Sequence, residues 1–259
     1  MMKLPAMKSL GTAAVLAASA LFLASPAAHA DTFNFGSADA AATIITGAGT
    51  VTIDLFSLEV NPGSAAGELS GILFHLSGSG FGSTSTFGSE TAPDGLVTIN
   101  SNGTGTPAGS TISHWGTSIT GTTNPTICLE TVSGSGIHCA AGGQPEDMII
   151  APGSGPDPYS NANSSNRNFN PSIVTEAIFV LDIAGVTSDT QVLANSDNHV
   201  TFNFGTGPDS TESGTPCTPG AANCVPVSNP PVPEPSSLIL LGTGILGTAG
   251  MLRRKMFGA

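Results

Sequence analysis

Positive charge is nearly missing from the body of this sequence. Of 259 residues, six are Lys or Arg, and five of these lie in the terminal segments outside Asp31–Ser237. Arg167 is therefore the single basic residue of that stretch, which holds all eighteen acidic residues and carries a formal charge of −17 (1 minus 18). Because nucleic acid is bound mainly through Lys and Arg on its phosphates, we expect no nucleic-acid partner. We expect the negative charge of the body to keep the protein soluble, and the more specific alternative is that the body binds cations.

Charged residues of either sign and aromatic residues are also scarce, at 9% and 5% of the chain, whereas about 25% of residues are charged in a typical globular domain. Gly and Pro are abundant instead, with 33 and 19 residues, and both favour turns over helices. Apolar side chains alternate in short runs, among them Val51–Leu58, Glu68–Leu76 and Ile173–Ile183. This pattern predicts an all-β fold, specifically a β-sandwich-like extracellular domain.

The common catalytic motifs are missing as well, since the sequence contains no HExxH, no GxSxG and no P-loop. Glu146-Asp147 is an adjacent acid pair, but glycoside hydrolysis needs two carboxyl groups at a defined separation across a cleft. We expect this pair to lie in a solvated turn, and we expect the protein not to be an enzyme. The alternatives are a secreted polysaccharide hydrolase and a carbohydrate-binding module with Trp115 as its one tryptophan platform. A structural role is also expected for the isolated histidines His75, His114, His138 and His199.

Residues 1–30 have the three parts of a secretory signal peptide. Met1–Ser9 holds two lysines and no acid, Leu10–Ala24 is an apolar run, and small residues follow. Ala28-His29-Ala30 is an A-x-A site, whose small side chains suit the pockets of signal peptidase. We therefore predict cleavage between Ala30 and Asp31 and an exported mature chain.

Export permits disulfide bonds, and all four cysteines lie in the mature body. Cys128 and Cys139 flank a Gly-Ser-Gly turn, while Cys217 and Cys224 flank a Pro-Gly turn. Four cysteines allow three pairings, and we predict the two local ones because each pair brackets its own turn. A zinc site is the alternative, but it normally has CxxC spacing or nearby histidines, and His138 alone lies close.

Oxygen-bearing side chains gather in Pro152–Pro171, which has four prolines and five asparagines and contains Tyr159, the chain's one tyrosine. A loop of this length is typical of functional or disordered segments. Carboxylate and amide oxygens suit calcium, but their spacing here does not match an EF-hand loop. We predict no cofactor, and the open alternative is a calcium ion on Asp157, Asn161, Asn163 and Asn166.

The C-terminal segment combines a proline-flanked acid, an apolar stretch and a basic end. Pro233-Glu234-Pro235 precedes the apolar run Leu238–Leu252, which Arg253-Arg254-Lys255 follows. A helix of these fifteen residues rises about 22 Å, which is short for a hydrocarbon core of roughly 30 Å. Including Ser236 and Ser237 gives seventeen residues, the lower limit of a span. We predict a single transmembrane helix whose basic end stays in the cytoplasm, with the acidic body outside.

In its order of triplet, glycine-bearing helix and basic cluster, this tail resembles the PEP-CTERM sorting signal. The resemblance implies recognition by exosortase, a membrane-embedded transpeptidase-like enzyme, in a Gram-negative-type bacterium that makes exopolysaccharide. It also implies an exported protein that is tethered transiently in the inner membrane and then reaches the cell surface or the medium. The implied partners are signal peptidase, exosortase and exopolysaccharide. The residues that match are Pro233, Glu234 and Pro235 in the triplet and Arg253, Arg254 and Lys255 in the basic end.

These observations divide the chain into a signal peptide (1–30), an acidic β-rich extracytoplasmic domain (31–206), a Pro/Thr/Ser-rich linker (207–231) and the sorting signal (232–259). The sequence Thr-Phe-Asn-Phe-Gly opens and closes the predicted domain, at Thr32–Gly36 and Thr201–Gly205. The two copies are either ordinary edge strands or direct neighbours that bring the ends of the domain together. We expect a structural or exopolysaccharide-associated surface protein.

Overall fold

Strands make up nearly all of the regular structure in the computed structural model, which describes residues 30–131, 145–193, 200–207, 210–218, 221 and 223–224. These residues fall in a unit spanning His29–Pro230. The predicted transmembrane helix and sorting triplet lie outside the described residues, as does the predicted signal peptide except for Ala30. Among the helices of the described part, none is long and apolar enough to cross a membrane.

One half of the sheet is an antiparallel array of five strands. A tight turn joins its strands β2 and β3, and Gly49 in this turn has a φ of +81°, which glycine adopts without strain. β3 then directs Val51, Ile53 and Leu55 into the core, and Asp54 lies on the opposite face. In spatial order the strands are β5 (Thr86–Thr91), β12 (Glu176–Asp182), β3 (Thr50–Ser57), β2 (Ala40–Thr46) and β1 (Asp31–Gly36).

β15 (Thr211–Pro216) carries the sheet from this half into the other. It pairs with the end of β1 through Phe35 and Gly36, and with β14 on its other side. All pairings in this second array are antiparallel. Its strands are β14 (Val200–Phe204), β4 (Leu69–Leu76), β9 (Thr126–Glu130) and β8 (Gly116–Thr120), with the short β13 (Val192–Leu193) beside the end of β4.

A group of short strands extends the sheet from the start of β4. β10 and β11 run parallel to each other, and the remaining pairings of this group are antiparallel. Two helical turns accompany them, η2 (Ala65–Gly67) before β4 and α2 (Ser164–Asn168) beside β6. The strands are β10 (Ile149–Ile150), β11 (Ser172–Val174), β6 (Leu96–Ile99) and β7 (Gly105–Gly109).

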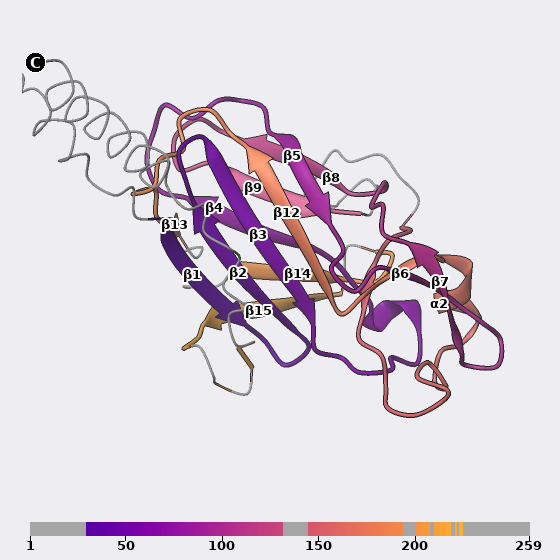
Figure 1. Cartoon of the computed structure of the whole chain (residues 1–259). Coiled ribbons are helices and arrows are strands. Elements are labelled where there is room, and N and C mark those ends of the chain that lie inside the picture. Colours follow the sequence, from indigo (N-terminus) through magenta and orange to yellow (C-terminus); the bar gives the residue numbers. More distant parts are fainter. Residues whose placement is uncertain are drawn as a thin grey trace, which may run out of the picture. The chain divides into compact units, whose positions relative to one another are not determined.

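The sheet curls on itself, so that two layers of strands face each other (Figure 1). β1, β2, β3, β12 and β5 form one layer, and β4, β9 and β14 lie behind it. Apolar side chains from both layers pack in one continuous core cluster. The predicted all-β class is therefore confirmed, in the form of one curled sheet. The large side chains at its centre include Ile53, Leu55 and Phe179 from the first layer and Phe74, Ile127 and Phe202 from the second.

The strands predicted from alternating apolar residues are present, with one informative difference. The run Ile173–Ile183 is divided into β11 and β12. Thr175 lies between them with a φ of +62°, a left-handed conformation that interrupts a strand. A single non-glycine residue in this conformation is not visible in the apolar pattern, so the sequence predicted one long strand.

β15 lies within residues 207–231, the stretch interpreted from its composition as a linker. The sheet thus continues beyond the second copy of the Thr-Phe-Asn-Phe-Gly repeat. The two copies, in β1 and β14, are not direct neighbours because β15 lies between them and pairs with both. The first and last strands of the described domain, β1 and β15, are nevertheless adjacent.

Candidate functional site

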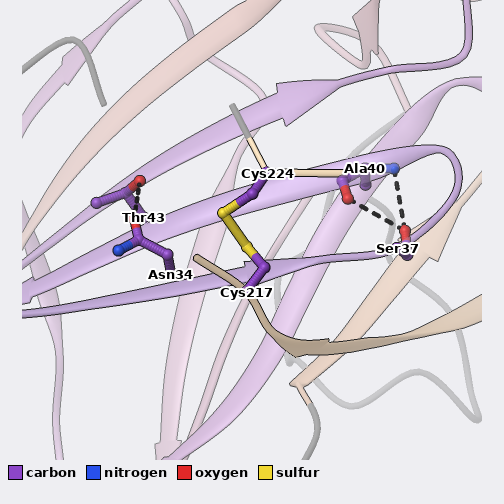
Figure 2. The surroundings of a disulfide bond; sticks show 6 residues. All are labelled: Asn34, Ser37, Ala40, Thr43, Cys217 and Cys224. Atoms are coloured by element: carbon purple, nitrogen blue, oxygen red, sulfur yellow. Dashed lines mark hydrogen bonds between the residues drawn. A yellow bond between two sulfur atoms is a disulfide. The ribbon is translucent and has the colours of Figure 1, made fainter. Parts of the chain in front are cut away.

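The last described residues lead toward the predicted sorting segment, and a disulfide bond fixes them. Cys217 and Cys224 are bonded, with their Cα atoms 5.8 Å apart, which confirms this predicted pair. Cys217 directly follows β15, and its backbone N–H donates to the carbonyl oxygen of Asn34 in β1 at 3.0 Å. Figure 2 shows the bond beside β1. The chain therefore leaves the sheet through a closed loop that is anchored on β1.

β1 is shaped to accept this loop at Gly36. A Cβ atom at this position would overlap the backbone carbonyl oxygen of Asn223, so no larger residue fits without a shift of the loop. The neighbouring turn from β1 to β2 is held by Ser37, whose hydroxyl donates to the Ala40 carbonyl oxygen at 3.1 Å and accepts from the Ala40 N–H at 3.0 Å (Figure 2). The entry and the exit of the described domain are thereby held together.

Several predicted site residues lie outside the described part of the chain. Cys128 lies buried in β9 and is not free, but its predicted partner Cys139 is not described, so this pairing stays a prediction. His138 and His199 also lie outside the described residues. His75 is described, and its Nδ1 lies 3.1 Å from the Thr126 hydroxyl of the neighbouring strand. The sorting residues Pro233, Glu234, Pro235, Arg253, Arg254 and Lys255 are likewise outside the described ranges.

One histidine contacts both members of the predicted acid pair. His114 Nε2 lies 3.2 Å from Glu146 Oε2, and His114 Nδ1 lies 3.0 Å from Asp147 Oδ2. The same Oδ2 atom accepts hydrogen bonds from the backbone N–H groups of Ser113 and His114, at 2.9 and 3.1 Å. Trp115 Nε1 donates to the carbonyl oxygen of Asp147 at 2.8 Å. These contacts fasten the segment before β8 to the segment before β10.

The contacts of this cluster differ from those of two common hydrolase sites. A serine–histidine–acid triad needs the serine and the acid on different ring nitrogens, but Ser113 Oγ and Asp147 Oδ2 both face Nδ1 of His114. A glycosidase pair must present both carboxyl groups to the substrate, whereas Asp147 is 1% exposed rather than in the solvated turn we expected. Trp115 packs 4.6 Å from the Phe179 ring and is buried, so it offers no platform for a sugar.

The long loop Pro152–Pro171 is attached to the sheet through a buried carboxyl group. Glu68, which precedes β4, is fully buried, and its Oε1 accepts from Asn166 Nδ2 at 2.7 Å. Its Oε2 accepts from the Ser172 hydroxyl at 3.3 Å. Asn166 belongs to α2, whose N-cap Asn163 accepts a hydrogen bond from the backbone N–H of Ser165. The loop is thus an ordered part of the domain.

Burial raises the pKa of Glu68 to about 8, although the hydrogen bonds from Asn166 and Ser172 act in the opposite direction. Asp54, on the outer face of β3, has a pKa of about 8 as well, raised first by burial and then by the neighbouring Glu176 carboxyl group. Both groups are therefore mostly protonated at neutral pH. Sequence reasoning missed both, because the partners of each lie far away in the chain.

Three of the four residues considered for calcium are engaged in other contacts. Asn161 is bonded to Asn61. Its backbone N–H donates to Asn61 Oδ1 at 3.0 Å, and its side-chain amide donates to the Asn61 carbonyl oxygen at 3.2 Å. Asn163 caps α2, and Asn166 is engaged with the buried carboxyl group described above. The backbone carbonyl of Asp157 accepts from a neighbouring N–H in a turn. Within the described ranges, no group of three or more His, Cys, Asp or Glu residues is placed to hold a metal ion.

Comparison with known proteins bears on the C-terminal segment. The family model described as the PEP-CTERM protein-sorting motif matches residues 231–255. No match was found among the curated proteins or among the solved structures. The matched range contains the triplet and the basic cluster, and it begins seven residues after Cys224, where the disulfide loop ends.

A C-terminal sorting motif of this kind implies export to the cell surface or the medium. More narrowly, the chain carries a PEP-CTERM protein-sorting motif, as the resemblance indicated, and this motif implies processing by exosortase.

Proposed function

We propose that the described domain is a non-catalytic component of the cell surface or extracellular matrix, which the C-terminal segment delivers. The observation that carries the proposal is the sorting motif at residues 231–255. The domain itself supports a structural role, since the clustered histidine and acids at His114, Glu146 and Asp147 are engaged with one another. Signal peptidase removes residues 1–30, and exosortase acts on an intermediate tethered in the inner membrane.

The order of the tail gives each part a physical task. Proline fixes its own φ, lacks an N–H, and restricts the residue before it, so Pro233-Glu234-Pro235 favours an extended backbone that a processing enzyme can bind. The apolar run Leu238–Leu252 holds this triplet at the membrane face. Arg253-Arg254-Lys255 stops further export, because basic residues remain on the cytoplasmic side.

The test is replacement of all three residues of Pro233-Glu234-Pro235 by alanine in the native host. Export should continue, since the signal peptide is intact, but C-terminal processing should stop and the full-length chain should accumulate in the inner membrane. A matched control replaces three residues of the preceding linker, outside the matched range, namely Pro226, Ser228 and Asn229, and should be processed normally. Cell fractionation with intact-mass analysis reports both outcomes.

Two results would contradict the proposal. If the triplet variant is trimmed and released like the wild type, exosortase does not act on this segment. If the purified wild-type protein shortens polysaccharides in a turnover assay, the domain is a hydrolase and not a structural component.

A further inference from the structure

A surface cleft of about 350 Å³ lies where the loop Pro152–Pro171 meets β6 and β7. Its volume is at the lower end of the range for small-molecule sites, roughly 300–1,000 Å³. The lining is mainly apolar and includes three prolines and three aliphatic side chains. The residues that matter for its chemistry are Asp94, Val97, Pro107, Pro158, Tyr159 and Val174.

Tyr159 lines this cleft and carries a hydroxyl group. Its ring is 3% exposed, packed with Val97 and Ile99 in a second small core, and its backbone N–H donates to the Gly103 carbonyl oxygen at 2.9 Å. Within the described residues the Tyr159 hydroxyl has no hydrogen-bond partner, and its oxygen retains some contact with solvent. Burial raises the pKa of Tyr159 to about 12, so the phenol remains a neutral donor at physiological pH. A hydroxyl without a partner on a buried side chain calls for one, and a bound ligand would supply it.

Asp94 supplies a second polar group at the cleft. It lies in the turn between β5 and β6 and is exposed, and its carboxylate takes part in no hydrogen bond of the described residues. The hydroxyl of Thr104 at the same cleft is already engaged, since it donates to Asn102 and accepts from Asn100. The cleft therefore offers one free donor, one free carboxylate acceptor and apolar walls.

We propose that this cleft binds a neutral sugar residue of a polysaccharide, an inference that rests on the extracellular placement in the proposed function. A pyranose ring has an apolar C–H face and a rim of hydroxyl groups, which match the apolar walls and the two polar groups. Hydroxyl groups donate to carboxylates in charge-assisted hydrogen bonds. Anionic sugars are disfavoured, because Asp94 lies at the cleft and the body carries one basic residue against eighteen acids.

A proline-rich peptide fits this cleft less well. Recognition of such peptides uses grooves lined by exposed aromatic rings. Here the ring of Tyr159 is covered, and the prolines at the cleft belong to this protein and not to its ligand. The peptide is therefore an outcome that the experiment must separate from the sugar.

The chain offers two unique reporters for this experiment, because it has one tyrosine and one tryptophan. Tyr159 lines the cleft, while Trp115 is buried against Phe179 and does not line it. The full chain is labelled with 3-fluorotyrosine and 5-fluorotryptophan in a sugar-free detergent. The probes are neutral hexasaccharides of glucose (α1→4 and β1→4), mannose and N-acetylglucosamine. An anionic hexagalacturonate and a ten-residue polyproline peptide serve as comparison probes.

The expected result is that at least one neutral hexasaccharide shifts the ¹⁹F resonance of Tyr159 in a saturable manner and leaves that of Trp115 in place. Calorimetry with that sugar should show that Tyr159→Phe, which removes the hydroxyl alone, weakens binding about tenfold. Asp94→Asn should weaken binding as well, while the matched surface variant Asp189→Asn should bind like the wild type.

The proposal is overturned if no neutral hexasaccharide moves the Tyr159 resonance, if hexagalacturonate binds as tightly, or if the polyproline peptide alone binds. It is also overturned if Tyr159→Phe binds with unchanged affinity. Because this assay uses purified protein, its result is independent of the triplet test in the host. A failure of sorting and a failure of sugar binding are therefore distinguishable.

Discussion

The buried carboxyl group of Glu68 leads to a quantitative prediction for the substitution Glu68→Gln. In the wild type, burial raises the pKa of Glu68 from 4.5 in the unfolded chain to about 8 in the folded one. Between these values the folded state binds one more proton at this site than the unfolded state does. The contribution of Glu68 to the free energy of unfolding therefore falls as pH rises, by up to about 1.4 kcal/mol per pH unit, and levels off above pH 8.

Glutamine reproduces the protonated form of the side chain. Its carbonyl oxygen accepts from Asn166, as Oε1 of Glu68 does, and its amide group faces the hydroxyl of Ser172, which can accept. The variant therefore keeps both contacts but has no proton to lose. From pH 5 to pH 8 we expect the free energy of unfolding of Glu68→Gln to rise by about 3 kcal/mol relative to the wild type.

Urea unfolding at a series of pH values measures this difference directly. The remaining buried acids are present in both proteins, so their contributions cancel in the comparison. Glu68→Ala is the matched control: it also loses the titration, but it leaves the Asn166 amide without its acceptor and should cost about 1–3 kcal/mol at pH 5. Parallel pH profiles for wild type and Glu68→Gln would refute the reasoning, because they would mean that Glu68 is ionised in the folded protein.

Three further outcomes follow from the same contacts. Replacing Cys217 and Cys224 together by serine should lower the free energy of unfolding by about 2 kcal/mol, the closure entropy of so short a loop, as measured by urea unfolding; an unchanged midpoint would contradict it. Asp54→Asn should gain stability relative to the wild type as pH rises from 4 toward the Asp54 pKa of about 8, and a constant difference in thermal midpoint over this range would count against it. Mass spectrometry of the exported protein should find Asp31 as the first residue, whereas an intact Met1 would exclude cleavage after Ala30.

The sequence predicted strands whose side chains alternate, whereas strands without a regular alternation were missed, both the apolar β2 and several polar ones. β3 and β4 are recognisable because every second side chain enters the core. β7 and β8 are short edge strands with few buried side chains, so their backbone hydrogen bonds, not their side chains, define them. β15 has the composition of a linker, yet its backbone groups are bonded on both sides, to β1 and to β14.

The contacts of the candidate sites depend on distances in the chain that a sequence pattern does not reveal. Asn166 is 98 residues from Glu68, and Asp147 is 33 residues from His114. Local signals worked where the partners are close: Cys217 and Cys224 are separated by seven positions and bracket a turn. The sorting motif could also be recognised from the sequence, because it is defined by the order of residues in one short contiguous segment and not by a fold.

The central claim, that the tail decides where this protein goes, is tested most directly by the mass of the C-terminal peptide of the exported wild-type protein. The account predicts a chain that ends near Pro233-Glu234-Pro235 and lacks Leu238–Leu252 and the basic cluster. The same peptide should stay uncut, in the inner membrane, when the exosortase gene of the host is deleted. An exported protein that retains Arg253-Arg254-Lys255, or one that is trimmed equally without exosortase, would contradict the account.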